Sequence, residues 1–435
     1  MMKNIKINNS KMFLLMLIIT FSSSSLYAFE WSSSTRLSLS EEYNDNLNLD
    51  SDNEEDDFIT IITPGIQTSL GWQRTGFSAA YDLGYSIYNE HSENDSFRHH
   101  GEVGWWWNVF QHTRLTLGDS YVKSEDIADL PDSGTERASR EGYYSNSARM
   151  NLVHRFGENR NVSAGYVYGI SNYEDEENDD NISHDAFIDS TYFFNPHTGV
   201  ETHLAYTKGL YDIAQDFDEW VGTLRLMRNL SRGLQINGSY SHTMMSYEDE
   251  GDDNNYQIYN PSVGIRYSFG EDGIMALNIG YFIQDIDSQN NEKGLTVDGN
   301  VGRSWRFRQG TISLTGSSGY ENSQLNSENL GFNVYYGAES RFEYQFSRTV
   351  SSSIFATYRH NDYVNSSPDD SDRVDKLISS GCSLNLQIAR WLSSSLDYNF
   401  RNLNSNSDEN NYTENRVMIR INVMTQHGRE EAANN

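Results

Sequence analysis

The chain lacks most of what a soluble enzyme or a disulfide-rich protein contains. Among 435 residues there is one cysteine, Cys382, so no disulfide can form within the chain. The five prolines are few, and because proline cannot donate to a β ladder, this favours long uninterrupted strands. Lysine and arginine number 32 against 62 acidic residues, so the basic footprint that nucleic-acid binding requires is missing.

Long apolar runs are also missing beyond the N-terminus. No later segment approaches the roughly 20 apolar residues that a membrane helix needs. The mean hydropathy is -0.68. This value does not argue against a membrane location, because the strands of a membrane barrel alternate lipid-facing and lumen-facing residues and keep the average low.

The N-terminus has the layout of a secretory signal peptide. Lysines precede ten largely apolar residues, 12–21, and a small-residue stretch then ends at Ala28. The alternative is a buried N-terminal helix, which the short apolar run and its flanks disfavour. We therefore expect a signal peptide at 1–28. Its removal takes away three lysines and leaves a net charge of 29 − 62 = −33.

A hairpin-length repeat runs through the rest of the chain. A large apolar residue recurs before a short turn at intervals of 36 to 46 residues, and longer polar stretches lie midway between these turns. Such a period indicates a repeated supersecondary unit, here strand, short turn, strand and long loop. The apolar residues are Trp72, Phe110, Phe156, Phe194, Leu230, Phe269, Trp305, Phe346 and Trp391.

The segments between turns alternate with a period of two. Residues 417–423 place Val, Ile, Ile and Val on one face and Met, Arg and Asn on the other. Nine turns and ten loops separate about 20 strands, or 18 if one hairpin is miscounted. We predict an all-β, up-and-down antiparallel transmembrane barrel over 29–424, followed by a polar periplasmic tail at 425–435.

The long loops are acidic, and the short turns are not. Residues 44–57 hold seven acids and no base, and residues 174–180 hold six acids. Short periplasmic turns and long extracellular loops are typical of outer-membrane barrels. The aromatic residues before the turns would then form a periplasmic girdle, and Tyr43, Tyr88, Tyr173 and Tyr247 part of an outer one. In a soluble repeat protein the same aromatics would form a core, but girdles at both strand ends favour the membrane.

No catalytic or cofactor motif is present, so we expect neither an enzyme nor a cofactor. G-x-S-x-G, H-E-x-x-H and the P-loop are missing, and one cysteine cannot build a thiolate metal cluster. We also expect no metal site. The acidic run with Glu248, Asp249, Glu250, Asp252 and Asp253 is the best calcium candidate, but it is more typical of a solvated, mutually repelling loop.

The alternation also predicts which charged residues face the lumen. Mixed arginines and carboxylates on a barrel wall can create a field across a water-filled pore, or they can be structural cross-strand pairs. Barrels of 16 to 18 strands already enclose a channel, which a folded-in loop such as 124–141 could narrow. The candidate lumen residues are Arg225, Arg266, Arg341, Arg401, Arg420, Glu339, Glu343 and Asp397, and the same phase turns Arg36, Arg98, Arg416, Glu42 and Asp82 inward.

The first hairpin resembles a known family. The run Glu41-Glu42-Tyr43-Asn44-Asp45-Asn46-Leu47, an acidic gap, and then the run Phe58 to Ile66 are similar to the opening of the putative beta-barrel porin 2 family. The resemblance implies an outer-membrane barrel associated with exopolysaccharide export systems. It does not identify a substrate.

Two functions of different classes follow. The first is a passive channel in the outer membrane of a Gram-negative bacterium, which could be the exit for an exopolysaccharide or another hydrophilic solute. The second is a surface adhesin or receptor that acts through its acidic extracellular loops. We expect the partners to be outer-membrane lipid and the barrel assembly machinery, together with polysaccharide or periplasmic export components if the export role holds.

Overall fold

The computed structural model describes residues 30–126, 142–174, 179–213, 215–248, 255–269, 273–286, 293–303, 305–306, 309–323, 331–364, 373–407 and 410–429. Nearly all of these residues lie in strands, apart from one short 3-10 helix, η1 (Ser92–Asn94). The strands are β1 (Glu30–Asn44), β2 (Asp57–Gly71), β3 (Thr75–Tyr88), β4 (Ser96–Phe110), β5 (Thr113–Ser124), β6 (Tyr143–Gly157), β7 (Arg160–Tyr173), β8 (Asn181–Asn195), β9 (Thr198–Tyr211), β10 (Phe217–Asn229), β11 (Leu234–Tyr247), β12 (Tyr256–Phe269), β13 (Gly273–Ile286), β14 (Lys293–Arg303), β15 (Trp305–Arg306), β16 (Gly310–Ser323), β17 (Gly331–Gln345), β18 (Val350–Val364), β19 (Arg373–Ala389), β20 (Leu392–Ser405) and β21 (Tyr412–Arg429).

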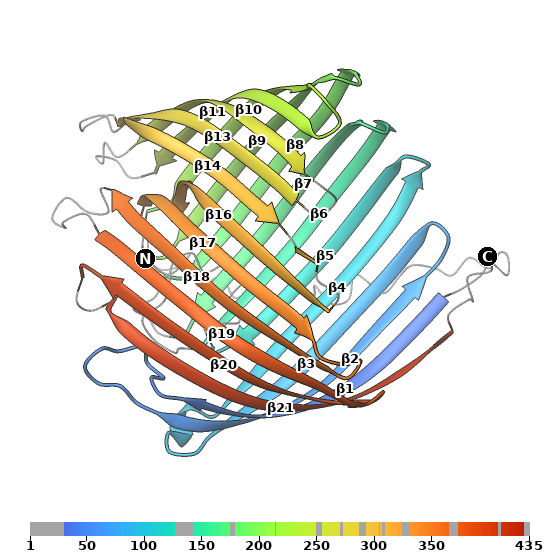
Figure 1. The fold of residues 1–435 in the computed structure, drawn as a ribbon, viewed down its shortest axis with the longest axis vertical. Helices are drawn as coiled ribbons and strands as arrows, with labels where there is room; N and C mark the ends of the chain where they lie inside the picture. Colours follow the sequence, from blue (N-terminus) through green and yellow to red (C-terminus); the bar gives the residue numbers. More distant parts are fainter. Residues whose placement is uncertain are drawn as a thin grey trace, which may run out of the picture.

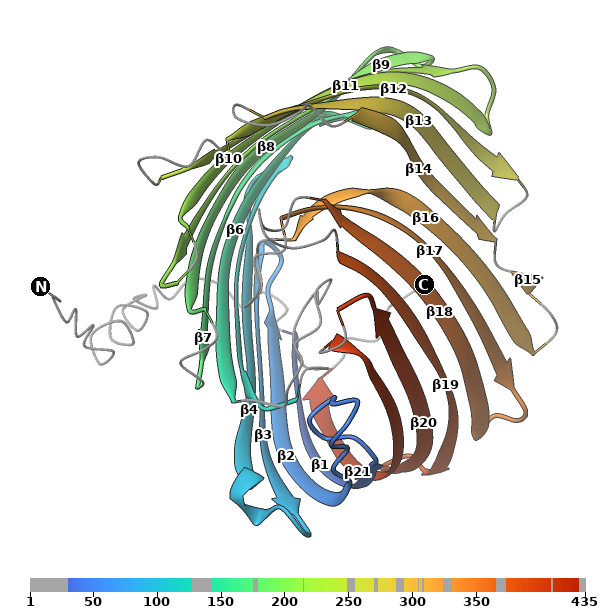
Figure 2. The same ribbon diagram turned by 90° about the vertical axis from the view of Figure 1, so that its left-hand side faces the viewer.

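The strands form one antiparallel sheet that curls into a barrel of 20 strands, because β14 and the two-residue β15 occupy a single strand position (Figures 1 and 2). Neighbours in the chain are neighbours in the wall, and β1 pairs with β21 over 14 residues, so the sheet returns to its start. This confirms the predicted fold and strand count. Such closure pairs the backbone groups that a lipid environment could not satisfy.

One seam in the wall is weaker than the others. Between β14 and β16, the ladder within the described part of the chain consists of Trp305 opposite Ile312 and Arg306 opposite Thr311. The neighbouring ladder of β13 and β14 holds 11 pairs. The barrel is therefore nearly closed. Within the described ranges, no helix is both long enough and apolar enough to cross a membrane.

Side-chain exposure separates the two faces of the wall. Along β21, Val417, Ile419 and Ile421 are exposed on the outside, and Arg416 lies on the lumen side. Cys382 on β19 is also exposed and stands opposite Ile354 of β18, which belongs to the outer apolar face. A strand that is apolar outside and polar inside inverts the usual pattern of a soluble barrel and suits a lipid surround.

The C-terminal strand is longer than the sequence pattern predicts. We placed the end of the barrel at residue 424, but β21 continues to Arg429 and pairs there with Trp31 of β1. The polar residues 425–429 extend the strand because ladder pairing uses backbone groups, which do not depend on side-chain polarity. Residues 430–435 and the predicted signal peptide at 1–28 lie outside the described residues.

The aromatic girdle at the short-turn end stays a prediction, but the structure shows where its residues lie. Its side chains stand exposed where strands end, with Phe269 partly exposed. The backbone of Trp305 lies in β15, and its side chain is outside what the structure describes. The exposed members are Trp72, Phe110, Phe156, Phe194, Phe346 and Trp391.

The predicted outer girdle is wrong for three of its four tyrosines. Tyr88 is 3% exposed and packs inside the barrel against Leu47. Tyr173 contacts the buried Tyr143, and Tyr247 packs on an interior cluster around Phe217. The error has a simple cause. These tyrosines fall on the lumen phase of their strands, and a one-residue offset reverses the face of a side chain.

Candidate functional site

The loop between β1 and β2 folds into the barrel and is fastened to β21 (Figure 2). Asn44 donates a 2.8 Å hydrogen bond to Glu414. Asp45 accepts bonds of 2.6 and 2.7 Å from the backbone and the side chain of Asn415. Asn46 donates to a backbone carbonyl of β21 at 3.0 Å. The E-Y-N-D-N run that carries the family resemblance is therefore the segment that turns the first loop inward.

Two leucines anchor this loop in apolar pockets on the lumen side. Leu47 is 1% exposed and packs against Ile59 and Ile61 of β2. Leu49 adopts a positive φ of 54° and packs with Leu403 of β20. Full burial of a leucine contributes roughly 1.5–3 kcal/mol. A loop that the sequence presents as acidic and solvated is held inside by these two side chains.

A cluster of buried charges lies beside this loop. Arg416 of β21 contacts Glu42 at 2.9 Å and Asp126 at 2.7 Å, and the Glu42 side chain has no exposed surface. Arg98 of β4 contacts Glu125 at 2.6 Å and reaches Asp126 at 3.6 Å. Asp126 thus links two arginines from opposite sides of the β1–β21 junction. This cluster fixes the start of the loop after β5 inside the lumen, the loop we expected to narrow the pore.

The pKa of Glu125 reflects this environment. Burial alone would raise the pKa of its carboxyl, but the positive charge and hydrogen bonds of Arg98 outweigh burial and hold the pKa below its usual range. Glu125 is therefore ionised at neutral pH and stays bound to Arg98. The ion pair contributes to the position of this loop except in strong acid.

The cluster opens into a cavity of about 780 Å³ on the β1–β5 and β20–β21 side of the lumen. We call it the charged cavity. Arg36 pairs there with Asp82, and Asp397 accepts a 2.8 Å bond from Ser395. Its principal polar lining residues are Arg36, Asp82, Arg98, Asp126, Asp397, Arg416 and Arg420.

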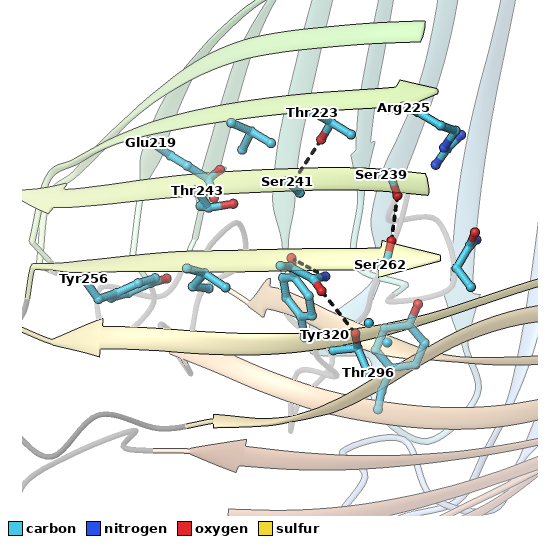
Figure 3. A pocket seen from close by; sticks show the side chains of 17 residues that line it. Glu219, Thr223, Arg225, Ser239, Ser241, Thr243, Tyr256, Ser262, Thr296 and Tyr320 are labelled. Carbon is cyan, nitrogen blue, oxygen red and sulfur yellow. Dashed lines mark hydrogen bonds between the residues drawn. The ribbon is translucent and has the colours of Figure 1, made fainter. Parts of the chain in front are cut away.

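A second cavity of about 450 Å³ lies in the wall of β10–β13, β14, β16 and β17, and we call it the hydroxyl cavity (Figure 3). Hydroxyl pairs line it: Thr223 with Ser241 at 2.9 Å, and Ser239 with Ser262 at 2.6 Å. Its polar lining residues are Glu219, Thr223, Arg225, Ser239, Ser241, Thr243, Tyr256, Asn260, Ser262, Asn278, Thr296, Tyr320 and Tyr335.

Amides and phenols complete this lining. Asn260 donates to the Tyr320 hydroxyl at 3.2 Å and accepts from Thr296 at 3.4 Å. Glu219 and Arg225 are the charged members, and Arg225 pairs with Glu201 at 3.1 Å. Every one of these groups can exchange hydrogen bonds with water or with a hydroxylated solute.

The structure places the predicted lumen residues on inward faces but does not gather them into one ring. Arg341 lies 3.6 Å from Glu339 and over the ring of Phe355. Arg420 and Asp397 share the charged cavity, and Arg225 lines the hydroxyl cavity. Glu343 lines a third groove of about 840 Å³ near the short turns. Arg266 and Arg401 face inward because exposed Tyr267 and Tyr398 occupy the outer phase of their strands.

Of the calcium candidate, the structure describes Glu248 alone. Glu248 binds Lys208, and residues 249–254 are outside the described ranges. Where the structure describes the chain, no group of three His, Cys, Asp or Glu side chains could hold a metal ion. The side chains of His99 and His100 point to opposite faces, His99 toward Tyr81 outside and His100 toward Glu102 inside.

Sequence reasoning missed the inward course of the first loop. The signal was present, since Leu47 and Leu49 are the apolar residues of an otherwise polar segment, 44–57, and sit two positions apart. Two such residues on one side of a loop indicate burial. Leu47 packs against Ile59 of the strand that follows the loop, but Leu49 packs against Leu403, which is far away in the sequence, and the alternation gives no means of pairing these two leucines.

Comparison with known families gives a match over residues 239–425 to the family described as putative beta-barrel porin 2. The match extends from β11 to β21. It does not include the first hairpin, whose motif suggested the same family, so two separate parts of the chain agree. No curated protein is similar in sequence to this chain.

Solved structures that are similar to this chain include two proteins of Pseudomonas aeruginosa. The siderophore receptor PirA of Pseudomonas aeruginosa is 10% identical, with 92% of this chain and 81% of that chain covered and a TM-score of 0.51. OccK2 (OpdF) of Pseudomonas aeruginosa, solved in complex with glucuronate, is 11% identical over 92% and 100% of the two chains, with a TM-score of 0.44. At such identities the likeness shows the fold alone.

Proposed function

Because the chain is an integral, porin-like β-barrel of the Gram-negative outer membrane, we propose that it is a passive channel for hydroxyl-rich hydrophilic solutes. Among such solutes, we propose first an exopolysaccharide that leaves the cell through this channel. The observation that carries the proposal is the hydroxyl cavity, a stretch of lumen wall in which serine, threonine, tyrosine and asparagine side chains outnumber the two charged ones (Figure 3).

A hydroxyl-lined wall suits a moving sugar chain. Each hydroxyl or amide can exchange a bond to water for a bond to the solute, and the net free energy of such an exchange is only about 0.5–1.5 kcal/mol. Weak, repeated contacts let a polymer advance without being trapped, whereas a tight site would hold it. Conduction in pores generally needs binding that is weak and spread over several sites.

The proposal includes transport without catalysis and without a cofactor. The barrel assembly machinery would insert the chain, and periplasmic export components would deliver the solute to the short-turn end. Both partners belong to the proposal through the fold and the family resemblance.

The adhesin hypothesis also has an observation in its favour. The first loop and the start of the loop after β5 occupy lumen space on the charged side. If these segments close the pore, the acidic loops at that end would be the working part of the molecule. The two hypotheses differ in one property, the presence of a stable open state.

Planar-bilayer recording of the purified barrel separates them. The channel hypothesis predicts stable open steps, and neutral oligosaccharides of increasing length should block the current more strongly as more units contact the wall. A Tyr320→Phe/Asn260→Ala variant should weaken this block about 2- to 10-fold per lost hydrogen bond, by the free energies above. Absence of any stable open state, with undisturbed folding, would reject the channel and favour the adhesin.

A further inference from the structure

The outer, lipid-facing surface carries a repeated group of side chains that has no part in the lumen. Three times, a histidine stands directly opposite a lysine on the next strand, and a tyrosine of the preceding strand contacts the histidine. We call these groups the Tyr-His-Lys triplets. They are Tyr81, His99 and Lys123 on β3–β5, Tyr166, His184 and Lys208 on β7–β9, and Tyr336, His360 and Lys376 on β17–β19.

The triplets lie at the upper border of the apolar belt. Each histidine and lysine is within four residues of the strand end that carries the longer loops. At about 3.3 Å per residue, this is within about 13 Å of that end along the strand. On β19, Lys376 is followed on the same face by exposed Ile378, Cys382 and Leu384. The lysine therefore stands where the hydrocarbon-facing residues begin, at the headgroup level of the outer leaflet.

The tyrosines orient the imidazoles. The Tyr81 hydroxyl is 2.6 Å from Nδ1 of His99, and the Tyr166 hydroxyl is 2.7 Å from Nδ1 of His184. When the phenol donates to Nδ1, the ring proton resides on Nε2, which then points a donor away from the tyrosine. His360 is held differently, stacked on Tyr336 with ring centroids 4.5 Å apart.

The three lysines differ in whether a carboxylate of the protein pairs with their ammonium group. Lys123 contacts Glu174 at 3.0 Å, and Lys208 contacts Glu248 and Asp218. Lys376 has no carboxylate within ion-pair distance among the residues that the structure describes. The pair of His360 and Lys376 is thus a donor-rich site on the outer face, and its positive charge meets no carboxylate of the described ranges.

We propose that the β17–β19 triplet binds a phosphate group of the outer-leaflet glycolipid, lipopolysaccharide. Phosphate is the anionic group present at this depth of that leaflet. It accepts charge-assisted hydrogen bonds from an ammonium and an imidazole at once. Tyr336 and Tyr358 flank the site as interfacial aromatics. The other two triplets bind the same lipid more weakly, because their lysines share their charge with carboxylates.

The chain contains a natural comparison. At β11 and β12, His242 stacks on Tyr259 with centroids 4.7 Å apart, but its Nε2 faces the Gln257 amide at 3.2 Å. The aromatic and the imidazole are present there, and the lysine is replaced by a neutral side chain. This position should not hold a phosphate.

The test is a titration of the delipidated, folded barrel in detergent with purified lipopolysaccharide, and in parallel with the same lipid after enzymatic dephosphorylation. Binding is measured by native mass spectrometry. We expect wild type to bind the phosphorylated lipid at least about 10-fold more tightly, since hydrogen bonds to charged groups are the strong ones. H360Q/K376Q should lose most of this preference, and H242Q should keep it.

Three outcomes would overturn the proposal: equal affinity for the two lipids, an unchanged preference in H360Q/K376Q, or an equal loss in H242Q. The heat-modifiable migration of each variant in gels verifies that its barrel is folded. The affinity of the single variant K376Q provides a second test. It should lose more affinity than K123Q, whose lysine is already paired, and the reverse order would contradict the assignment of the site to β17–β19.

Discussion

The two sides of the lumen differ in the side chains that line them and in what those side chains hold. On the β1–β5 and β20–β21 side, Arg98 and Arg416 bind carboxylates at distances down to 2.6 Å and hold loop segments inside the barrel. On the β10–β17 side, hydroxyls and amides pair with one another and leave an open wall. Strong, directed pairs position a segment, and weak, exchangeable ones leave a path free.

The difference follows from burial. Arg416 is 13% exposed, and its carboxylate partners are buried beneath the inserted loop, so their attraction is little screened by water. Arg225, on the hydroxyl side, is 40% exposed and faces one carboxylate. Arginine therefore stabilises the structure on the charged side, whereas on the hydroxyl side it can be replaced at little cost in stability.

Arg416→Ala should have the largest effect. It leaves Glu42 and Glu414 buried without the cation of Arg416 and leaves Asp126 with Arg98 alone, and removal of one partner of a buried pair costs about 3–5 kcal/mol. We expect a matching drop in the free energy of unfolding, measured by urea titration in lipid vesicles. Arg225→Ala is the matched control and should cost at most about 1 kcal/mol, as for exposed pairs. Equal costs would remove the distinction between the two sides.

Shortening the first loop should change the pore more than the stability. Replacing residues 47–55 by a short Gly-Ser turn removes Leu47 and Leu49 from the lumen. Single-channel conductance should rise, because the charged cavity then opens to solvent. Shortening the acidic loop near 215, whose Asp216 bonds to the backbone of Tyr211 at the strand end, serves as the control and should leave conductance unchanged. An unchanged conductance in the first variant would mean that the loop does not limit the pore.

Acid should loosen one side only. Because the folded pKa of Glu125 is depressed, its pairing with Arg98 stabilises the loop above the usual carboxyl pKa of about 4.3 and is lost as pH falls through the folded pKa. The protection factor of the amides of segment 125–126 against hydrogen exchange should therefore fall below about pH 4, whereas that of the amides around Ser241 should not change. Glu125→Gln should show fast exchange already at pH 7. A pH-independent protection of the wild-type segment would contradict the role of this pair.

Replacing Arg225, Arg266 and Arg341 together by Ser should have the smallest effect. These side chains face the lumen, where substitutions tune selectivity rather than folding. The reversal potential in a salt gradient should shift toward cation preference, since Glu339 and Glu343 remain. Heat-modifiable migration should be that of wild type. No shift in reversal potential would mean that none of the three arginines lies along the conducting path.

The wall of the barrel could be predicted from the sequence because a period of two is a local signal. Alternation alone predicts that Arg36, Arg98 and Arg416 face inward, and the hairpin period predicts about 20 strands. The end of β21 was misjudged because residues 425–429 are polar, and their place in the ladder depends on β1, a strand almost 400 residues away.

The site could be predicted only in part. That Arg416 faces the lumen is a local property, but its contact with Asp126 joins residues 290 apart in the chain. The inward position of the first loop depends on the packing of Leu47 against β2 and of Leu49 against β20. The hydroxyl cavity gathers serines and threonines that are individually unremarkable in a strand, and barrel curvature alone brings them together.

Cysteine accessibility tests most directly whether solutes pass along the hydroxyl side. In a Cys382→Ser background, single cysteines replace Ser262 in the hydroxyl cavity or Ser40, a buried lumen residue of the charged cavity. A charged, membrane-impermeant thiol reagent is added during single-channel recording. We predict rapid modification at 262 with a stepwise loss of current, and little modification at 40. Fast modification at 40 with none at 262 would place the path on the other side of the lumen and contradict the account.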